Sequence, residues 1–353
     1  MKSLALWYEK SGNGQDDNQN LELHINFWKL PSSNTFKRFL DFGFKIEHPE
    51  FIKKIFVFLP ISINKDELVD VGKIIADHKS LLLTAIFNED YKITFEENTP
   101  YLEIKDAKDK CQFWLTLLRK ISSSENNRKY TEPIFYVSKE EYGSIITIEL
   151  PEHIDRSPIY FRIRIASDSL ISLSHIFIPN DSLFYSALKK VELFDFRINS
   201  KRHLPASVLN KISESNLFNL TKINFFFICD SNEDILLTQK QFIRTRVLES
   251  NLWDKYLNFS LQKKHKLLAY QWKLLNKDHS IITDFSLLIK SQFKHYNWIN
   301  IGKYLLVLFL VGLLLNLTSS FLYDKIKNNS PTFESNSTNS SKITTLDKKN
   351  DKN

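Results

Sequence analysis

Glycine is scarce in this sequence, with 7 residues among 353, and cysteine is rarer still, with 2. Loops that cradle phosphate groups need several glycines at fixed spacing, and the chain contains no P-loop, no Rossmann fingerprint and no Gly-x-Ser-x-Gly nucleophile motif. Cys111 and Cys229 lie far apart, and neither has a second cysteine or a histidine at zinc-ligand spacing. We therefore expect no cofactor, no metal and no disulfide framework, and a reducing compartment.

Charge is missing from one long stretch near the carboxyl end. The segment 304–323 contains no Asp, Glu, Lys, Arg or His. A helix of this length, rising about 1.5 Å per residue, spans the hydrocarbon core of a bilayer. Tyr304 and Tyr323 at its ends suit the interfacial aromatic belt. We predict one transmembrane helix that contains Leu310, Gly312 and Asn316, and Asn316 could hydrogen-bond to a second copy and favour a homo-oligomer.

The orientation of this span follows from what precedes it. The apolar run after Met1 is interrupted by Glu9, so no signal peptide is expected. A large region made before the anchor should then stay in the cytoplasm, with the carboxyl end outside the inner (plasma) membrane, a layout like that of tail-anchored proteins. Lys290, Lys294 and Lys303 flank the span on the side that we place inside.

The net charge of +7 is distributed unevenly. Residues 1–260 hold 34 Lys and Arg against 35 Asp and Glu, whereas residues 261–303 hold eight lysines against two aspartates. Because the basic excess lies beside the span, the expected partner is a bilayer with an anionic inner leaflet, and nucleic acid is not expected to bind.

The pattern of apolar residues predicts an α+β cytoplasmic region that is strand-rich to about residue 230 and helical from about residue 239. Segments such as 158–165 and 221–229 alternate or are apolar throughout, which favours strands. In 261–276 and 281–296 the apolar residues favour helices, and in the second they recur at spacings of three and four. We divide the chain into two α+β subdomains, basic juxtamembrane helices, the transmembrane helix and a disordered polar tail, at 1–122, 130–260, 261–303, 304–323 and 324–353.

A short constellation in the first subdomain suggests a catalytic alternative. Asp90 precedes one predicted strand, and Glu103 and Lys105 share a face of the next. An Asp followed by Glu-x-Lys resembles the metal-binding core of the PD-(D/E)xK nucleases, although no proline precedes Asp90. The resemblance covers about forty residues. It implies a membrane-anchored nuclease in which two carboxylates hold Mg²⁺ and the lysine stabilises the attacking water or the phosphate.

Two pairs of arginines suggest a binding role instead. Arg162 and Arg164, like Arg244 and Arg246, are spaced to share one face of a strand, and if the two strands are neighbours they form an anion-binding patch. The alternative is a solvated or salt-bridged sheet face. For the whole chain we favour a non-enzymatic module, a sensor or scaffold that binds an unknown cytoplasmic ligand or protein. This architecture is similar to that of bacterial signalling or defence effectors, an analogy of layout only. A membrane-disrupting pore is a third alternative, and it requires several copies because one span cannot form a channel.

Overall fold

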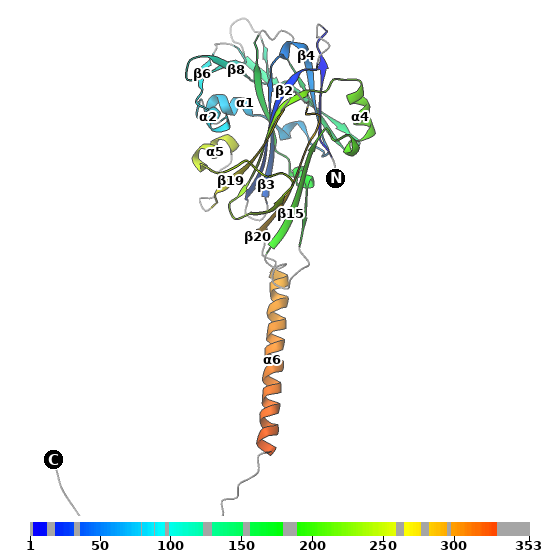
Figure 1. Ribbon diagram of the computed structural model, residues 1–353, viewed down its shortest axis with the longest axis vertical. Coiled ribbons are helices and arrows are strands. Elements are labelled where there is room, and N and C mark those ends of the chain that lie inside the picture. Colours follow the sequence, from blue (N-terminus) through cyan, green and yellow to red (C-terminus); the bar gives the residue numbers. More distant parts are fainter. Residues whose placement is uncertain are drawn as a thin grey trace, which may run out of the picture. The chain divides into compact units, whose positions relative to one another are not determined.

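The fold is seen in a computed structural model that describes residues 3–12, 18–31, 36–78, 80–87, 89–95, 99–122, 129–150, 156–178, 189–258, 265–276, 282–294 and 298–329. The chain divides into two compact units, Met1–Tyr296 and Asn297–Asn353, and each is described by itself. Figure 1 shows the strands and short helices of the first unit and the long helix of the second.

A ten-stranded sheet dominates the described part of the first unit. Along the sheet the strands are β18 (Arg244–Leu248), β19 (Leu267–Leu275), β16 (Asn219–Asp230), β2 (Asn20–Pro31), β3 (Phe36–Ile46), β13 (Ile159–Ile165), β8 (Cys111–Thr116), β7 (Tyr101–Lys105) and β6 (Lys92–Phe95), with β5 (Leu68–Asp70) also paired to β13. Near its centre, β2 runs parallel to β16 and antiparallel to β3. The two expected subdomains thus both contribute strands to this sheet.

Smaller sheets accompany the large one in the described residues. One contains β1 (Ala5–Lys10), β4 (Ile52–Leu59), β12 (Gly143–Glu149) and β11 (Phe135–Glu140) in that order. Another contains β14 (Ser174–Phe177), β15 (Lys189–Ile198), β20 (Phe285–Lys294) and β17 (Asp234–Thr238), and β9 (Arg119–Ser122) pairs with β10 (Lys129–Pro133). Apolar residues of the large sheet and of both four-stranded sheets form one buried cluster, which is the main core.

Helices cover the other face of the large sheet. Figure 1 shows α1 (Val71–Asp77), α2 (Ser80–Phe87) and α5 (Ser250–Leu257) on one side of the unit and α4 (Ala206–Ser213) on the other. Helix α1 begins where the Asp70 carboxylate accepts a hydrogen bond from the Gly72 amide at 2.9 Å. Short 3₁₀ turns connect strands at Pro49–Phe51, Lys65–Glu67 and Asp168–Leu173, and another at Lys201–His203 lies between β15 and α4.

The alternation of β2 sorts its side chains between these two layers. Leu23, Ile25 and Phe27 enter the main core, whereas Trp28 packs in a second cluster with residues of α1, α2 and α5. His24 and Asn26 lie on the same face as Trp28 and are buried although they are polar. This helix-covered face of the sheet holds the candidate site.

The α+β class is confirmed, but the prediction of helices beyond residue 239 is correct only for α5 and the membrane helix. The predicted helices at 261–276 and 281–296 are wrong, because these segments contain β19 and β20. In β20, Phe285, Leu287 and Ile289 alternate with less buried neighbours, a period of two that the spacings of three and four concealed. Pairing with β15 along its whole length fixes β20 as a strand.

The second unit contains helix α6 (Trp298–Asn329). Its segment Ile301–Asn328 is long and apolar enough to span a membrane, which confirms the predicted span and lengthens it at both ends. The Thr318 hydroxyl donates to the carbonyl oxygens of Leu314 and Leu315, each at 2.9 Å, so this polar group is satisfied within the helix. Residues 324–329 of the predicted tail are helical, and residues 330–353 lie outside the described part of the chain.

Candidate functional site

Strand β13 places two arginines in the interior of the protein. It pairs with β3 along its whole length, and all of its residues are buried. Phe161 and Ile163 enter the main core, so the intervening residues face the helices. Arg162 and Arg164 therefore share the helix-covered face with Tyr160.

Arg164 is neutralised by a buried carboxylate. Its Nε donates to Asp41 Oδ1 at 2.7 Å and its Nη2 to Asp41 Oδ2 at 3.0 Å. Trp28 Nε1 at 2.8 Å and the Tyr256 hydroxyl at 2.7 Å also donate to Asp41 Oδ2. Burial alone would raise the pKa of the Asp41 carboxyl, but the charge and hydrogen bonds of Arg164, together with the charge of Arg162 and the hydrogen bond from Tyr256, outweigh it and lower that pKa. Asp41 is thus an anion whose two oxygens are both bound to Arg164.

Arg162 makes no hydrogen bond to a carboxylate among the described residues, although the charge of Asp41 attracts it and helps to raise its pKa. Its side chain is 1 % exposed, and its Nη1 donates to the Tyr160 hydroxyl oxygen at 3.2 Å. The ring of Tyr256 lies 5.7 Å from the guanidinium, but Nε and Nη2 have no hydrogen-bond partner in the described part of the protein. A guanidinium stays charged in proteins, so burying it with unsatisfied N–H groups is costly. Arg162 is the feature around which we build the site.

Other buried charges in the described chain show how unusual this is. Lys29 lies between the carboxylates of Glu192 and Glu233, and its Nζ is 2.8 Å from Glu233 Oε1. Arg38 Nη2 is 3.1 Å from Glu192 Oε1. These buried cations are thus each in contact with an opposite charge, which offsets the cost of removing them from water. The hydrogen bond of Arg162 goes instead to a neutral hydroxyl.

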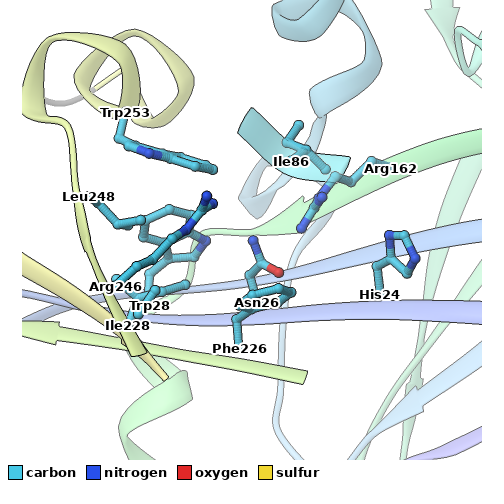
Figure 2. Close-up of a pocket in the computed structure, with 11 residues that line it drawn as sticks. His24, Asn26, Trp28, Ile86, Arg162, Phe226, Ile228, Arg246, Leu248 and Trp253 are labelled. Atoms are coloured by element: carbon cyan, nitrogen blue, oxygen red, sulfur yellow. The ribbon is translucent and has the colours of Figure 1, made fainter. Parts of the chain in front are cut away.

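Arg162 is one of the residues that line a small pocket between the large sheet and α5. Figure 2 shows the guanidinium groups of Arg162 and Arg246 on either side of the Asn26 amide, with the indole of Trp253 nearby. The lining residues are His24, Asn26, Trp28, Ile86, Arg162, Phe226, Ile228, Arg246, Leu248, Trp253 and Ala269. The cavity has a volume of about 20 Å³, which is room for little more than one water molecule.

The pocket offers mainly hydrogen-bond donors and positive charge. Trp253 Nε1, a donor only, is buried without a hydrogen-bond partner among the described residues. Arg246 Nη2 donates to the Ala85 carbonyl at 2.8 Å, which holds its guanidinium beside the pocket. Burial lowers the pKa of Arg246, but an arginine remains protonated at neutral pH. An acceptor-rich anion is the complement of this lining.

His24 adds a neutral ring rather than a charge. Its Nε2 is buried without a hydrogen-bond partner among the described residues, and its ring lies 5.4 Å from that of Phe87 and 5.7 Å from that of Tyr160. Burial, followed by the charges of Arg162, Lys222 and Lys45, holds the pKa of His24 well below its usual value. His24 is therefore uncharged at neutral pH.

Gly43 makes the close packing beside Arg162 possible. It lies opposite Arg162 in the β3–β13 register and opposite His24 in the β2–β3 register. A Cβ at Gly43 would clash with the Tyr160 hydroxyl oxygen, so any side chain there would displace the ring. Tyr160 is the hydroxyl that accepts from Arg162, and the glycine thereby helps to set the position of the guanidinium.

The predicted arginine patch is only partly assembled. β13 and β18 are not neighbours, because β3, β2, β16 and β19 separate them in the sheet. Even so, Arg162 and Arg246 reach one pocket from opposite sides of β2, whereas Arg164 is bound to Asp41 and Arg244 is exposed.

Sequence reasoning missed every pocket residue except the two arginines, and the missed residues include His24, Asn26 and Trp253. The available signal for the first two was the alternation of polar and apolar residues in β2. By itself that pattern indicates a face in water, and only the helices that cover the sheet make it a buried one. Trp253 lies on an apolar helix stripe and carries no local signal of a binding role.

The nuclease-like residues do not form a comparable cluster. Lys105 Nζ is 3.0 Å from Glu103 Oε2, so these two side chains pair with each other on β7. In the β6–β7 register Thr94 lies opposite Glu103, and Asp90 is an exposed residue that precedes β6. Within the described residues no group of three or more His, Cys, Asp or Glu could hold a metal ion.

Comparison with known proteins gives no family assignment. No protein-family model matches the chain, and no curated protein sequence matches it either. We therefore infer the function from the pocket and the membrane helix.

The two arginines of β13 are expected to respond oppositely to the same substitution. Arg162→Met removes a buried charge whose Nε and Nη2 are unsatisfied and should raise the free energy of unfolding of the ligand-free protein by about 1–3 kcal/mol. Arg164→Met leaves the Asp41 carboxylate without its cation and should lower it by about 3–5 kcal/mol. Urea unfolding of the full-length protein in detergent, followed by tryptophan fluorescence, measures both. A destabilised Arg162→Met variant would contradict our description of Arg162 as unpaired.

Burial of neutral His24 predicts a loss of stability in acid. The pKa of His24 is lowered in the folded state, so between that value and about 6.5 the unfolded chain binds a proton that the folded protein does not. The stability from this group is present above about pH 6.5 and is lost as the pH falls, by at most about 1.4 kcal/mol per pH unit. Urea midpoints of the wild type and His24→Gln at a series of pH values should diverge below pH ~6.5. Parallel curves would show that His24 titrates normally.

Proposed function

We propose that the protein is a membrane-anchored binding module whose folded region, Met1–Tyr296, binds a small anionic ligand in the pocket beside Arg162. One observation carries the proposal: a fully buried guanidinium whose Nε and Nη2 have no hydrogen-bond partner among the described residues. A ligand that supplies negative charge offsets the cost of burying Arg162 and gains charge-assisted hydrogen bonds. Binding is then coupled to the stability of the fold.

The second half of the proposal concerns the membrane. Helix α6 supports anchoring, and Lys290, Lys294 and Lys303, which precede or begin it in the sequence, favour an anionic leaflet on the side of the folded region. We place that region in the cytoplasm and the carboxyl end outside the inner (plasma) membrane. Asn316 is exposed on α6, and its pairing with a second copy stays a prediction.

A sensor or scaffold role suits this pocket better than catalysis. Its polar lining consists of two guanidinium groups, an amide, an indole N–H and a neutral imidazole. These groups bind and orient an anion, and the aromatic rings of Trp28, Phe226 and Trp253 give it an apolar border. The ligand would then report its presence through the stability of the domain that the membrane helix carries.

Anion binding can be tested by the thermal stability of the full-length protein in detergent at low salt. Sodium phosphate, sodium acetate and sodium chloride are added separately to the wild type, to Arg162→Met and to Arg244→Met. We expect at least one anion to stabilise the wild type and Arg244→Met, by about 2.7 kcal/mol at a hundred times its dissociation constant, and to leave Arg162→Met unchanged. Arg244 is the matched control because it is an exposed arginine outside the pocket lining. Equal responses of all three proteins to every anion would remove the proposal.

The proposed orientation can be tested by cysteine labelling in intact cells. In a background with Cys111→Ser and Cys229→Ala, one variant carries Ser340→Cys in the carboxyl-terminal tail and another carries Ser213→Cys, an exposed position at the end of α4. A membrane-impermeant maleimide should label the first variant in intact cells and the second only after the cells are opened. The reverse pattern would place the folded region outside.

A further inference from the structure

Arg164 shows how the guanidinium of an arginine on this face of β13 can be paired with an oxyanion. Arg164 uses Nε and Nη2, the two nitrogens along one edge of the guanidinium. They donate side by side to the two oxygens of Asp41, at 2.7 and 3.0 Å. Such a two-bond contact is specific for a planar or tetrahedral oxyanion, because it needs two oxygens a fixed distance apart.

The same edge of Arg162 is buried beside the pocket and has no partner among the described residues. Arg162 lies two residues before Arg164 on the same face of the strand, and its third nitrogen, Nη1, is already bonded to Tyr160. The two atoms that have no hydrogen-bond partner among the described residues are again Nε and Nη2. The group that would complete Arg162 therefore has the same shape as the carboxylate that Arg164 binds.

Resting on the proposed anion binding, we infer that the ligand carries an oxyanion head, a carboxylate or a phosphate, with two oxygens bound side-on by Arg162 Nε and Nη2. Three observations beyond the unpartnered edge favour this chemistry. Arg246 brings a second positive charge to the pocket, and Trp253 Nε1 is another unpartnered donor in the described structure. The cavity of about 20 Å³ has room for little more than one water molecule, so it would receive the charged oxygens, and the rest of the ligand would lie outside it.

Chloride is negatively charged but lacks the two oxygens of an oxyanion. Comparing its affinity with that of an oxyanion therefore distinguishes recognition of charge from recognition of shape. The full-length protein in detergent is titrated with sodium acetate, sodium phosphate or sodium chloride at matched ionic strength, and apparent dissociation constants are taken from the unfolding midpoints. In the wild type we expect acetate or phosphate to bind about tenfold or more tightly than chloride. The tighter of the two oxyanions identifies whether the head is planar or tetrahedral, and either result supports the inference.

Arg162→Lys keeps the charge and removes the two-nitrogen edge. We expect this variant to lose the preference for oxyanions over chloride while keeping a weaker response to both, and Arg244→Met to retain the wild-type preference. The wild-type comparison stands alone if Arg162→Lys fails to fold. Chloride binding as tightly as both oxyanions in the wild type, or an unchanged preference in folded Arg162→Lys, would overturn the side-on inference and leave anion binding intact. No response to any anion would remove both proposals.

Discussion

The buried ion pair between Asp41 and Arg164 holds together the parts of the protein on which the pocket depends. It joins β3 to β13, and through Trp28 and Tyr256 it also joins β2 and α5. The carboxylate accepts from three donor side chains, so its desolvation is offset by an unusually complete set of hydrogen bonds. Because α5 also carries Trp253, the same interaction fixes one wall of the pocket.

The two arginines of β13 have different surroundings, and we assign them different roles. Arg164 is paired with a carboxylate, while Arg162, two residues away, has two nitrogens without a partner among the described residues and is expected to reduce the stability of the ligand-free protein. Such a cost is consistent with the binding role that we propose for Arg162. The neutral His24 and the glycine at position 43 fit the same explanation, since they leave the guanidinium in place without neutralising it.

Much of this molecule could be predicted locally, and the rest could not. The membrane helix is evident from the length of its uncharged run, and β13 from its alternation, because both signals lie within one segment. Strand β20 was missed because Phe285, Ile289 and Phe293 fit both a helical and an alternating period. The pocket depends on the order of the strands. Arg162 and Arg246 line one pocket from opposite sides of β2 because β2 pairs with β16, a contact between residues about 200 positions apart.

That strand order sets the timing of folding during synthesis. At about 5–20 residues per second, β2 waits about 10–40 s for β16, its parallel neighbour, to be made. β20, which completes the sheet of β15, ends at Lys294, only a few residues before α6 begins at Trp298. The ribosome therefore releases this strand and the apolar helix almost together. Any factor that inserts the helix into a membrane therefore receives a chain whose first unit has not finished folding. That factor must keep both the apolar helix and the unpaired strand β20 from aggregating.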